Sequence, residues 1–191
     1  MLKAFLRALV KPSVVKVLTR ITILQHHLRM GRRVNFGPGF VCNNRLIIRG
    51  PGTVVFERDV NAWSHAEKNV LITYDRDARI VIGANTRLNG AGIMAQRGIT
   101  VGRDCILGSA LLVDTDFHSV ERDRRISPHP RVLSEPIHIG SNVWLCGQAA
   151  VLKGVTIGDN SVVGFRAVVT SDVPANVVVA GNPARVVKHL D

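Results

Sequence analysis

A chain of 191 residues is long enough for one domain with a hydrophobic core and too short for two of ordinary size. Hydrophobic residues make up 46% of it but aromatic residues only 5%, so the core must be built from aliphatic side chains. Eight of the eleven net positive charges lie in residues 1–33. The remainder of the chain is nearly balanced and has no recognisable nucleic-acid-binding motif, so nucleic acid is not expected as a partner.

Residues 1–33 form a basic arm with an amphipathic pattern and no acidic residue. Basic residues recur at intervals of four, at Lys3, Arg7 and Lys11 and again at Lys16 and Arg20. Aliphatic side chains fill much of the rest, which predicts one or two helices broken near Pro12. Two uses are open: the arm lies on an anionic membrane surface, or it packs its apolar face on its own domain or on a neighbouring subunit.

Neither a membrane span nor a secretory signal peptide is expected. No apolar run approaches the roughly 18–20 residues needed to cross a bilayer, and Lys11 interrupts the first apolar stretch without a small-residue cleavage site after it. Cys42, Cys105 and Cys146 are scattered and follow no metal-binding spacing, which favours buried thiols in a reducing compartment. We expect a cytoplasmic protein, either free or peripheral on the inner face of the membrane.

Residues 34–191 are predicted as a single domain because most of them repeat with a period of six. Aliphatic residues return at this step in three blocks: Ile82, Leu88 and Met94; Val101, Leu107 and Val113; and Ile139, Leu145, Val151, Ile157, Val163 and Val169. A solenoid explains the step, since three short strands make one coil and every sixth side chain stacks into a column. Glycines after several of these aliphatics suit tight corners. We predict an all-β solenoid with a loop excursion at 119–136 and a C-terminal tail at 175–191.

The C-terminal repeats carry the most specific motif of the chain. It reads IHIGSNVWLCGQAAVLKGVTIGDNSVVGFRAVVTSDVPANVVVAGNPARVVK. This segment resembles the closing part of the hexapeptide-repeat acyltransferases, among them galactoside, maltose and exopolysaccharide O-acetyltransferases, and the likeness covers about residues 46–191. The resemblance implies a left-handed parallel β-helix, acetyl-CoA as co-substrate, and a homotrimer with active sites between adjacent subunits. The six-residue period by itself shows neither handedness nor trimerisation.

The stretch DTDFHSV, residues 114–120, lies where the repeat gives way to an arginine-rich loop. Acetyl transfer from a thioester to a hydroxyl requires removal of the alcohol's proton, and an imidazole with an ordinary pKa near 6.5 suits that task at neutral pH. In the family that the chain resembles, the general base is a histidine sixteen residues after a corner glycine, the spacing between Gly102 and His118. The resemblance therefore implies that His118 is the catalytic base.

Asp114 and Asp116 lie on the same side as His118 if the stretch is extended. Three roles stay open for them: orienting the imidazole, binding the acceptor, or capping a turn. A metal role is not expected, because zinc enzymes with this fold have a second histidine five residues along, whereas this chain has Asp123 there.

The resemblance also implies roles for residues outside this stretch. Acceptor binding or orientation falls to Asn89 and to Trp144, for which a capping aromatic at a corner is the alternative. The Gly147 N–H is expected to stabilise the negative charge that develops on the thioester oxygen. Acetyl-CoA binding is expected at Gly147 and along the last coils, with Phe165 and Thr170 at the pantetheine arm and Arg185 and Lys188 near the phosphates. Phe165 and Arg166 depart from the small pair usual in the family, which leaves the detailed path of the pantetheine open.

These features predict an acetyl-CoA-dependent O-acetyltransferase that acts on a saccharide hydroxyl in surface polysaccharide biosynthesis. The basic arm makes a lipid-linked glycan an attractive acceptor. Two alternatives stay open: an acetyltransferase for a small xenobiotic or antibiotic, and a β-helical binding scaffold without catalysis. His118, Trp144 and the C-terminal GNPARVVK argue against the scaffold, which needs none of them.

Overall fold

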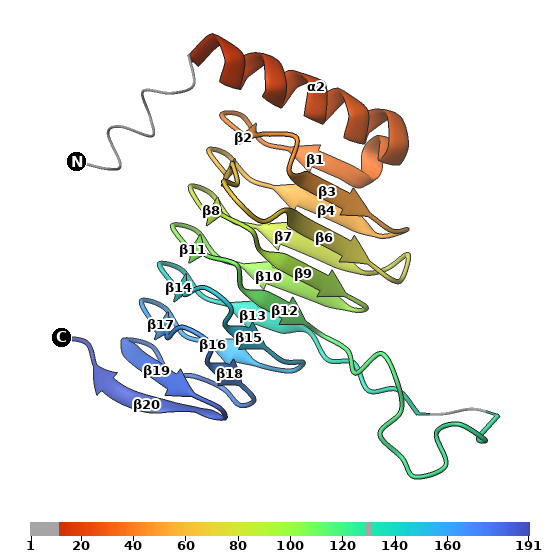
Figure 1. Ribbon diagram of the computed structural model, residues 1–191, viewed down its shortest axis with the longest axis vertical. Helices are drawn as coiled ribbons and strands as arrows, with labels where there is room; N and C mark the ends of the chain where they lie inside the picture. The colour runs from red at the N-terminus through yellow and green to blue at the C-terminus, as the bar shows by residue number, and fades with distance from the viewer. Residues whose placement is uncertain (1–11, 129–130) are drawn as a thin grey trace.

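The computed structural model describes residues 12–128 and 131–191 and shows a stack of parallel coils with a helix lying across its N-terminal end (Figure 1). The helix is α2 (Pro12–Met30), followed by the 3-10 turn η1 (Gly31–Arg33). The first 11 residues of the predicted arm, with Lys3, Arg7 and Lys11, lie outside the described residues. No helix of the described part is both long and apolar enough to span a membrane.

Three sheets run along the stack, and each coil contributes one strand to each sheet. The first sheet holds β1 (Val34–Phe36), β4 (Thr53–Phe56), β7 (Arg79–Ile82), β10 (Gly98–Val101), β13 (Ile137–Ile139) and β16 (Thr156–Ile157). The second holds β2 (Val41–Cys42), β5 (Asn61–Ala62), β8 (Arg87–Leu88), β11 (Ile106–Leu107), β14 (Trp144–Leu145), β17 (Val162–Val163), β19 (Val177–Gly181) and β20 (Ala184–His189). The third holds β3 (Leu46–Arg49), β6 (Asn69–Thr73), β9 (Gly92–Ala95), β12 (Leu111–Val113), β15 (Ala150–Val151) and β18 (Val168–Val169). This topology confirms the predicted solenoid.

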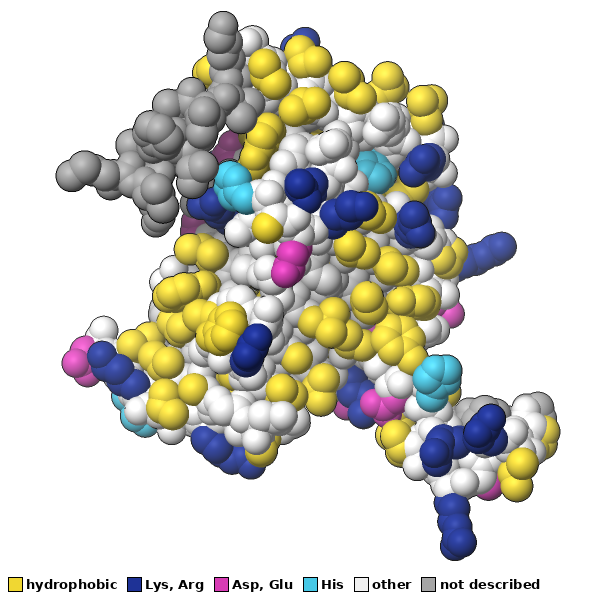
Figure 2. All heavy atoms as spheres, viewed as in Figure 1, with side chains coloured by type: hydrophobic (Ala, Val, Ile, Leu, Met, Phe, Trp, Pro, Cys, Tyr) yellow, Lys and Arg dark blue, Asp and Glu magenta, His cyan; other side chains and the backbone are white. Residues whose placement is uncertain are grey.

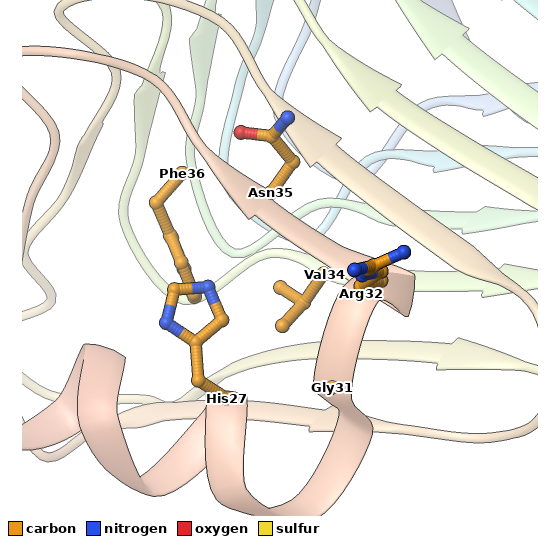
Figure 3. Close-up of a pocket in the computed structure, with 6 residues that line it drawn as sticks. All are labelled: His27, Gly31, Arg32, Val34, Asn35 and Phe36. Carbon is orange, nitrogen blue, oxygen red and sulfur yellow. The ribbon is translucent and has the colours of Figure 1, made fainter.

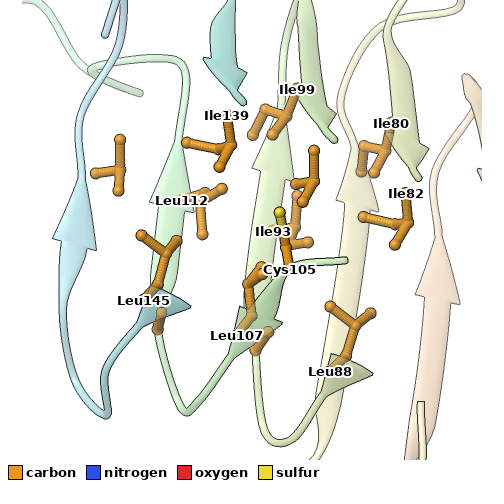
Figure 4. Packing of buried hydrophobic residues seen from close by; sticks show 14 of the residues in the cluster. Ile80, Ile82, Leu88, Ile93, Ile99, Cys105, Leu107, Leu112, Ile139 and Leu145 are labelled. Atoms are coloured by element: carbon orange, nitrogen blue, oxygen red, sulfur yellow. The ribbon is translucent and has the colours of Figure 1, made fainter. Parts of the chain in front are cut away.

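The core is a set of stacked aliphatic columns, as the six-residue period predicted. In the second sheet Leu107 pairs in register with Leu88 above it and Leu145 below it, and all three side chains are fully buried. In the first sheet Val101 likewise pairs with Ile82 and Ile139. Figure 4 shows the leucines of the second sheet, together with Ile82 and Ile139, pointing into the space that the three sheets enclose. Burial of one such side chain contributes about 1.5–3 kcal/mol, so the columns supply most of the cohesion between coils.

Glycine is required at one corner of the coil for space rather than for its backbone freedom. A Cβ on Gly83 would lie 2.4 Å from the carbonyl carbon of Gly102 in the next coil. The left-handed backbone conformation is found instead two residues after a corner glycine. The residues that adopt it there are Asn85, Asp104, Asn142 and Asn160, with φ between 55° and 61°. Asn and Asp tolerate this conformation better than other non-glycine residues. Their side chains form a ladder, in which Asn142 donates to Asn160 at 3.0 Å and Asn160 donates to Asn176 at 2.8 Å.

Helix α2 caps the open edge of the first coil with a face that buries polar side chains together with Met30. Thr19 Oγ1 donates to the Cys42 carbonyl at 2.9 Å and accepts from the Cys42 N–H at 3.2 Å. His26 Nε2 donates to the Leu46 carbonyl at 3.3 Å. These bonds satisfy strand groups that have no neighbouring coil on this side. Ile23 and Met30 pack against the core, whereas most of the remaining aliphatic side chains of α2 face away from the solenoid and are exposed.

Two segments leave the regular coils. Residues between Val113 and Ile137 project from the stack as a loop (Figure 1), which is where the excursion at 119–136 was predicted. Residues 175–191, predicted as a tail, contain β19 and β20, which pair antiparallel with each other. Because β19 also pairs parallel with β17, this hairpin closes the last coil and covers its edge.

Protonation of His26 is predicted to destabilise the fold. Burial lowers the pKa of His26 below its usual value, the positive charges of Arg29 and His27 lower it further, and the bond to Leu46 offsets this in part. Nδ1 of His26 has no hydrogen-bond partner among the described residues. The unfolded chain binds a proton here below about pH 6.5 while the folded chain does not, so the free energy of unfolding falls as pH drops below that value.

Urea unfolding at pH 7.5 and 5.5 measures this effect. We expect His26→Gln, which keeps a donor for the Leu46 carbonyl, to lose less stability between the two pH values than the natural chain. His65→Gln, at an exposed histidine, is the matched control and should behave as the natural chain does. Equal losses in all three proteins would show that His26 does not carry the effect.

Candidate active site

The loop that contains His118 is anchored at its base by main-chain hydrogen bonds. It leaves the stack after β12 and returns at β13. The Asp116 N–H donates to the Leu133 carbonyl at 3.0 Å, and the Glu135 N–H donates to the Asp114 carbonyl at 2.9 Å. Thr115 and Ser134 form an antiparallel bridge between these two bonds. The stem of the loop is thus a short ladder that is continuous with the coils, while residues 129–130 lie outside the described part.

Asp114 is fully buried and binds the main chain of the coil above it. Its carboxylate accepts hydrogen bonds from the N–H groups of Gln96, Arg97 and Gly98, at 2.6, 2.8 and 2.7 Å. This turn between β9 and β10 is the irregular step of the hexapeptide pattern. Because both carboxylate oxygens are engaged there, the geometry matches the turn-capping role among the three left open by the sequence.

Asp116 forms an ion pair with a residue that sequence reasoning missed. Lys153 Nζ lies 2.7 Å from Asp116 Oδ1, and both side chains are largely shielded from water. Lys153 follows β15, which pairs with β12, so the stacking of coils brings together residues 37 positions apart. No sequence pattern marks this lysine, because its position depends on the length of the loop between β12 and β13.

A strained turn presents His118 to solvent. Phe117, immediately before it, has a φ of 58°, a conformation that is rare for a bulky side chain. The His118 N–H donates to the Asp116 carbonyl at 2.6 Å, and the rings of Phe117 and Tyr74 form a T-shaped pair with centroids 5.0 Å apart. Strained residues held by such contacts cluster at functional sites. The Phe117 turn therefore indicates a functional role for His118 independently of the spacing between His118 and Gly102.

His118 lines a hollow of about 240 Å³ whose other walls come from the loop. The lining residues are Phe117, His118, Ser119, Arg124, Arg125 and Val132. Two guanidinium groups and an imidazole make this surface basic and rich in hydrogen-bond donors. In Figure 2 the projecting loop carries several of the basic side chains seen on this face.

A larger hollow of about 520 Å³ lies at the N-terminal end of the stack (Figure 3). It opens between the last turn of α2 and β1, with the His27 ring, Arg32 and Phe36 around it. None of the predicted site residues lines it. The hollow beside His118 is therefore the better candidate for catalysis despite its smaller size.

The remaining predicted residues lie at other places on the solenoid. Trp144 is half exposed on β14. A Cβ added to Gly147 would contact the Phe165 ring at 3.4 Å, so Gly147 and Phe165 are neighbours. The Arg166 guanidinium stacks over the Phe165 ring at 5.1 Å. Asn89 directly follows β8, which lies two coils before β14 in the same sheet. Its Oδ1 accepts a hydrogen bond from the His65 N–H at 3.2 Å.

The acetyl-CoA residues expected near the C-terminus are all exposed. Thr170 follows β18 at the end of the third sheet, while Arg185 and Lys188 lie on β20 of the second sheet. Arg185 donates to the Ala184 carbonyl at 2.8 Å. Within a single chain, none of these three residues lines the hollow beside His118.

The predicted residues thus divide between two corners of the triangular coil. His118 lies in the segment that connects the third sheet to the first, whereas Gly147 and Phe165 lie where the second sheet passes into the third. The third sheet separates these corners within one chain. A site that used both groups would need two copies of the chain side by side.

The cysteine side chains are poor nucleophiles at neutral pH. Burial raises the pKa of Cys42 to about 12, and burial also raises the pKa values of Cys105 and Cys146. A thiol that stays protonated does not attack a thioester efficiently. Cys146, although next to Gly147, is therefore not suited to a covalent acyl-enzyme step. Among the described residues, no three His, Cys, Asp or Glu side chains are grouped so that they could hold a metal ion.

Comparison with known proteins identifies relatives of this chain. Residues 136–171 match the family model described as bacterial transferase hexapeptide (six repeats). Galactoside O-acetyltransferase of Escherichia coli strain K12 is 36% identical over 132 residues, which cover 69% of this chain and 62% of that protein. The match therefore spans less than two thirds of this relative's length.

Two solved structures extend the comparison to the fold. A galactoside acetyltransferase in complex with coenzyme A superimposes with a TM-score of 0.52 at 30% identity, covering 80% of this chain and 66% of that one. A hexapeptide-repeat-containing acetyltransferase from Vibrio cholerae O1 biovar eltor, in complex with acetyl coenzyme A, gives 0.54 at 25% identity, covering 89% and 76%. The solenoid is thus a left-handed parallel β-helix of the acetyltransferase type, as the resemblance implied.

The two aspartates of DTDFHSV should differ in their contribution to stability. Asp114→Asn leaves one buried acceptor oxygen for three N–H groups and is expected to lower the free energy of unfolding by about 2–3 kcal/mol. Asp116→Asn weakens a single ion pair nearer the surface and should cost about 1 kcal/mol or less. Urea unfolding of both variants measures the difference. Equal losses would contradict the capping role of Asp114.

Proposed function

Because the chain is homologous to galactoside O-acetyltransferase and carries the six-fold repeat of the bacterial hexapeptide transferases, we propose that it is an acetyl-CoA-dependent O-acetyltransferase for a saccharide hydroxyl. The observation that carries the proposal is the presentation of His118 on a strained turn at the edge of a donor-rich hollow. Surface polysaccharide, or a precursor of it, is the acceptor we propose.

His118 acts as the general base in this reaction. Its imidazole removes the proton of the acceptor hydroxyl while the hydroxyl oxygen attacks the thioester carbonyl. The carbonyl oxygen gains negative charge, and the Gly147 N–H, which has no hydrogen-bond partner among the described residues, is available to stabilise it. The C–S bond then breaks, and the proton held by His118 passes to the departing thiolate. The products are the acetyl ester and free coenzyme A.

We propose that the complete site forms between two copies of the chain in a homotrimer. The separation of His118 from Gly147 and Phe165 by the third sheet supports this, since one chain supplies only half of the required groups. Phe165 and Thr170 would contact the pantetheine arm, and the exposed Arg185 and Lys188 would face the phosphates as cations. Asn89 and Trp144 would complete the acceptor side.

The character of the hollow favours a saccharide over an apolar xenobiotic. Arg124, Arg125 and Ser119 offer hydrogen-bond donors to an acceptor with many hydroxyl groups. The hollow opens on a projecting loop, which leaves room for a polymer to extend beyond the reacting unit. A pocket for an apolar drug is ordinarily enclosed and lined mainly by hydrophobic side chains.

Loss of the His118 imidazole should abolish most of the turnover. For His118→Ala we expect kcat to fall by about 10²–10⁴-fold with little change in stability, because the side chain is exposed and the main-chain bond of its N–H remains. Release of free thiol from acetyl-CoA, measured with a saccharide acceptor, gives the rate. His138→Ala, at an exposed histidine of β13, is the control. An unchanged rate for His118→Ala would refute the general-base role.

Subunit mixing tests whether the site is shared between copies. His118→Ala and Gly147→Val should each be inactive alone, the second because its side chain crowds the N–H that faces the oxyanion. Co-expressed in equal amounts, they should recover about one quarter of the natural rate, since random assembly of a ring pairs an intact half from each variant at that frequency. No recovery in mixed trimers of verified mass would indicate that each chain holds a complete site.

A further inference from the structure

Helix α2 presents a continuous apolar stripe to solvent. The outer stripe, as we call it, consists of Val14, Val17, Ile21, Leu24 and Leu28, with exposures of 44, 54, 48, 59 and 79%. Their spacing alternates between three and four residues, which places all five on one face of the helix. In Figure 2 hydrophobic side chains line the upper margin of the molecule, where Figure 1 places α2.

The outer stripe faces away from the solenoid because the opposite face of the helix is fixed by polar contacts. Thr19, Thr22 and His26 are buried on that side. Thr19 exchanges two hydrogen bonds with the main chain of Cys42, and His26 donates to the Leu46 carbonyl. Rotating the helix to bury the stripe would break these bonds and leave strand groups unpaired. Ile23 and Met30 pack against the core from the inner side of the helix, but the outer stripe has no cover within the described chain.

Positive charge borders the outer stripe on both sides. At 3.6 residues per turn, Lys16 and Arg20 lie along one margin and Arg29 along the other. Arg32 and Arg33 follow in η1, and the chain has no acidic residue before Glu57. An aliphatic stripe with cationic margins is the pattern of helices that lie in the interface of an anionic bilayer.

We propose that α2 docks the protein on an anionic lipid bilayer, with the outer stripe at the boundary of the acyl chains and the basic margins at the lipid phosphates. A second copy of the chain fits this face less well. Two such helices packed stripe to stripe would bring together five positive charges from each copy with no acidic side chain between them. An anionic membrane supplies the opposite charge along with an apolar phase.

One consequence of this docking, the access of a lipid-linked acceptor to His118, rests on the proposed function and deepens it. Because α2 lies across the end of the stack, the coils would stand away from the bilayer (Figure 1). The strand that leads to His118, β12, is three positions from β3 in the third sheet, or about 14 Å at 4.8 Å per step. An acceptor carried on a membrane lipid could therefore reach His118 from the side of the molecule without leaving its anchor.

Co-sedimentation of the full chain with vesicles tests the docking. We expect binding to vesicles of phosphatidylcholine containing one third phosphatidylglycerol, little binding to phosphatidylcholine alone, and weaker binding at high salt. Ile21→Ser with Leu28→Ser should lower the partition coefficient at least tenfold through lost apolar transfer. Lys16→Gln with Arg20→Gln should lower it by about fivefold for each charge removed. The substituted side chains are exposed, so the fold should persist in both variants.

A matched control is the pair Val120→Ser and Ile126→Ser, which removes two exposed aliphatic side chains from the loop instead of the helix and should bind vesicles as the natural chain does. Equal binding by the stripe variant and this control would overturn the proposal. So would a loss of oligomer mass in the stripe variant by light scattering, since it would assign the stripe to packing between subunits. Thiol release with a dissolved saccharide should be unaffected in the stripe variant. Vesicle binding by a protein inactive on every acceptor would refute the proposed function and leave the docking intact.

Discussion

Main-chain hydrogen bonding between successive coils is the constraint from which the other features of this molecule follow. Each strand pairs with the equivalent strand of the next coil, and the pairing places side chains such as Leu88, Leu107 and Leu145 directly above one another. The coils approach so closely that Gly83 has no space for a Cβ. A chain under this constraint accommodates extra residues only by leaving the stack completely, as it does between β12 and β13.

The candidate site forms where that constraint is released. Asp114 binds the turn between β9 and β10 through three main-chain N–H groups, and Asp116 joins the next coil through Lys153. Between these supports and the free loop, the strained Phe117 turn directs His118 outward. The coils thus hold His118 at the base of a projecting loop, an arrangement that suits the general base proposed above.

The first coil poses the opposite problem, because its strands have no neighbour on one side. Helix α2 covers this edge, and its Thr19 and His26 satisfy strand groups that would otherwise be exposed. The same orientation of the helix turns the outer stripe toward solvent. Capping of the fold and the exposure of the outer stripe, on which the proposed membrane docking rests, are therefore two consequences of one helix orientation, with the buried imidazole as its pH-sensitive point.

The sequence by itself determined the solenoid, because aliphatic residues at every sixth position are all buried when short strands stack in successive coils. The break in that period located the loop and His118. Only the tertiary structure decided which face of α2 is buried, because a helical period marks an apolar stripe without saying what it meets. It also separated Asp114 from Asp116, which the sequence left equivalent, and brought Lys153 to the site across 37 residues. Those contacts depend on the register between coils, and a register is set by chain segments far apart that no local pattern connects.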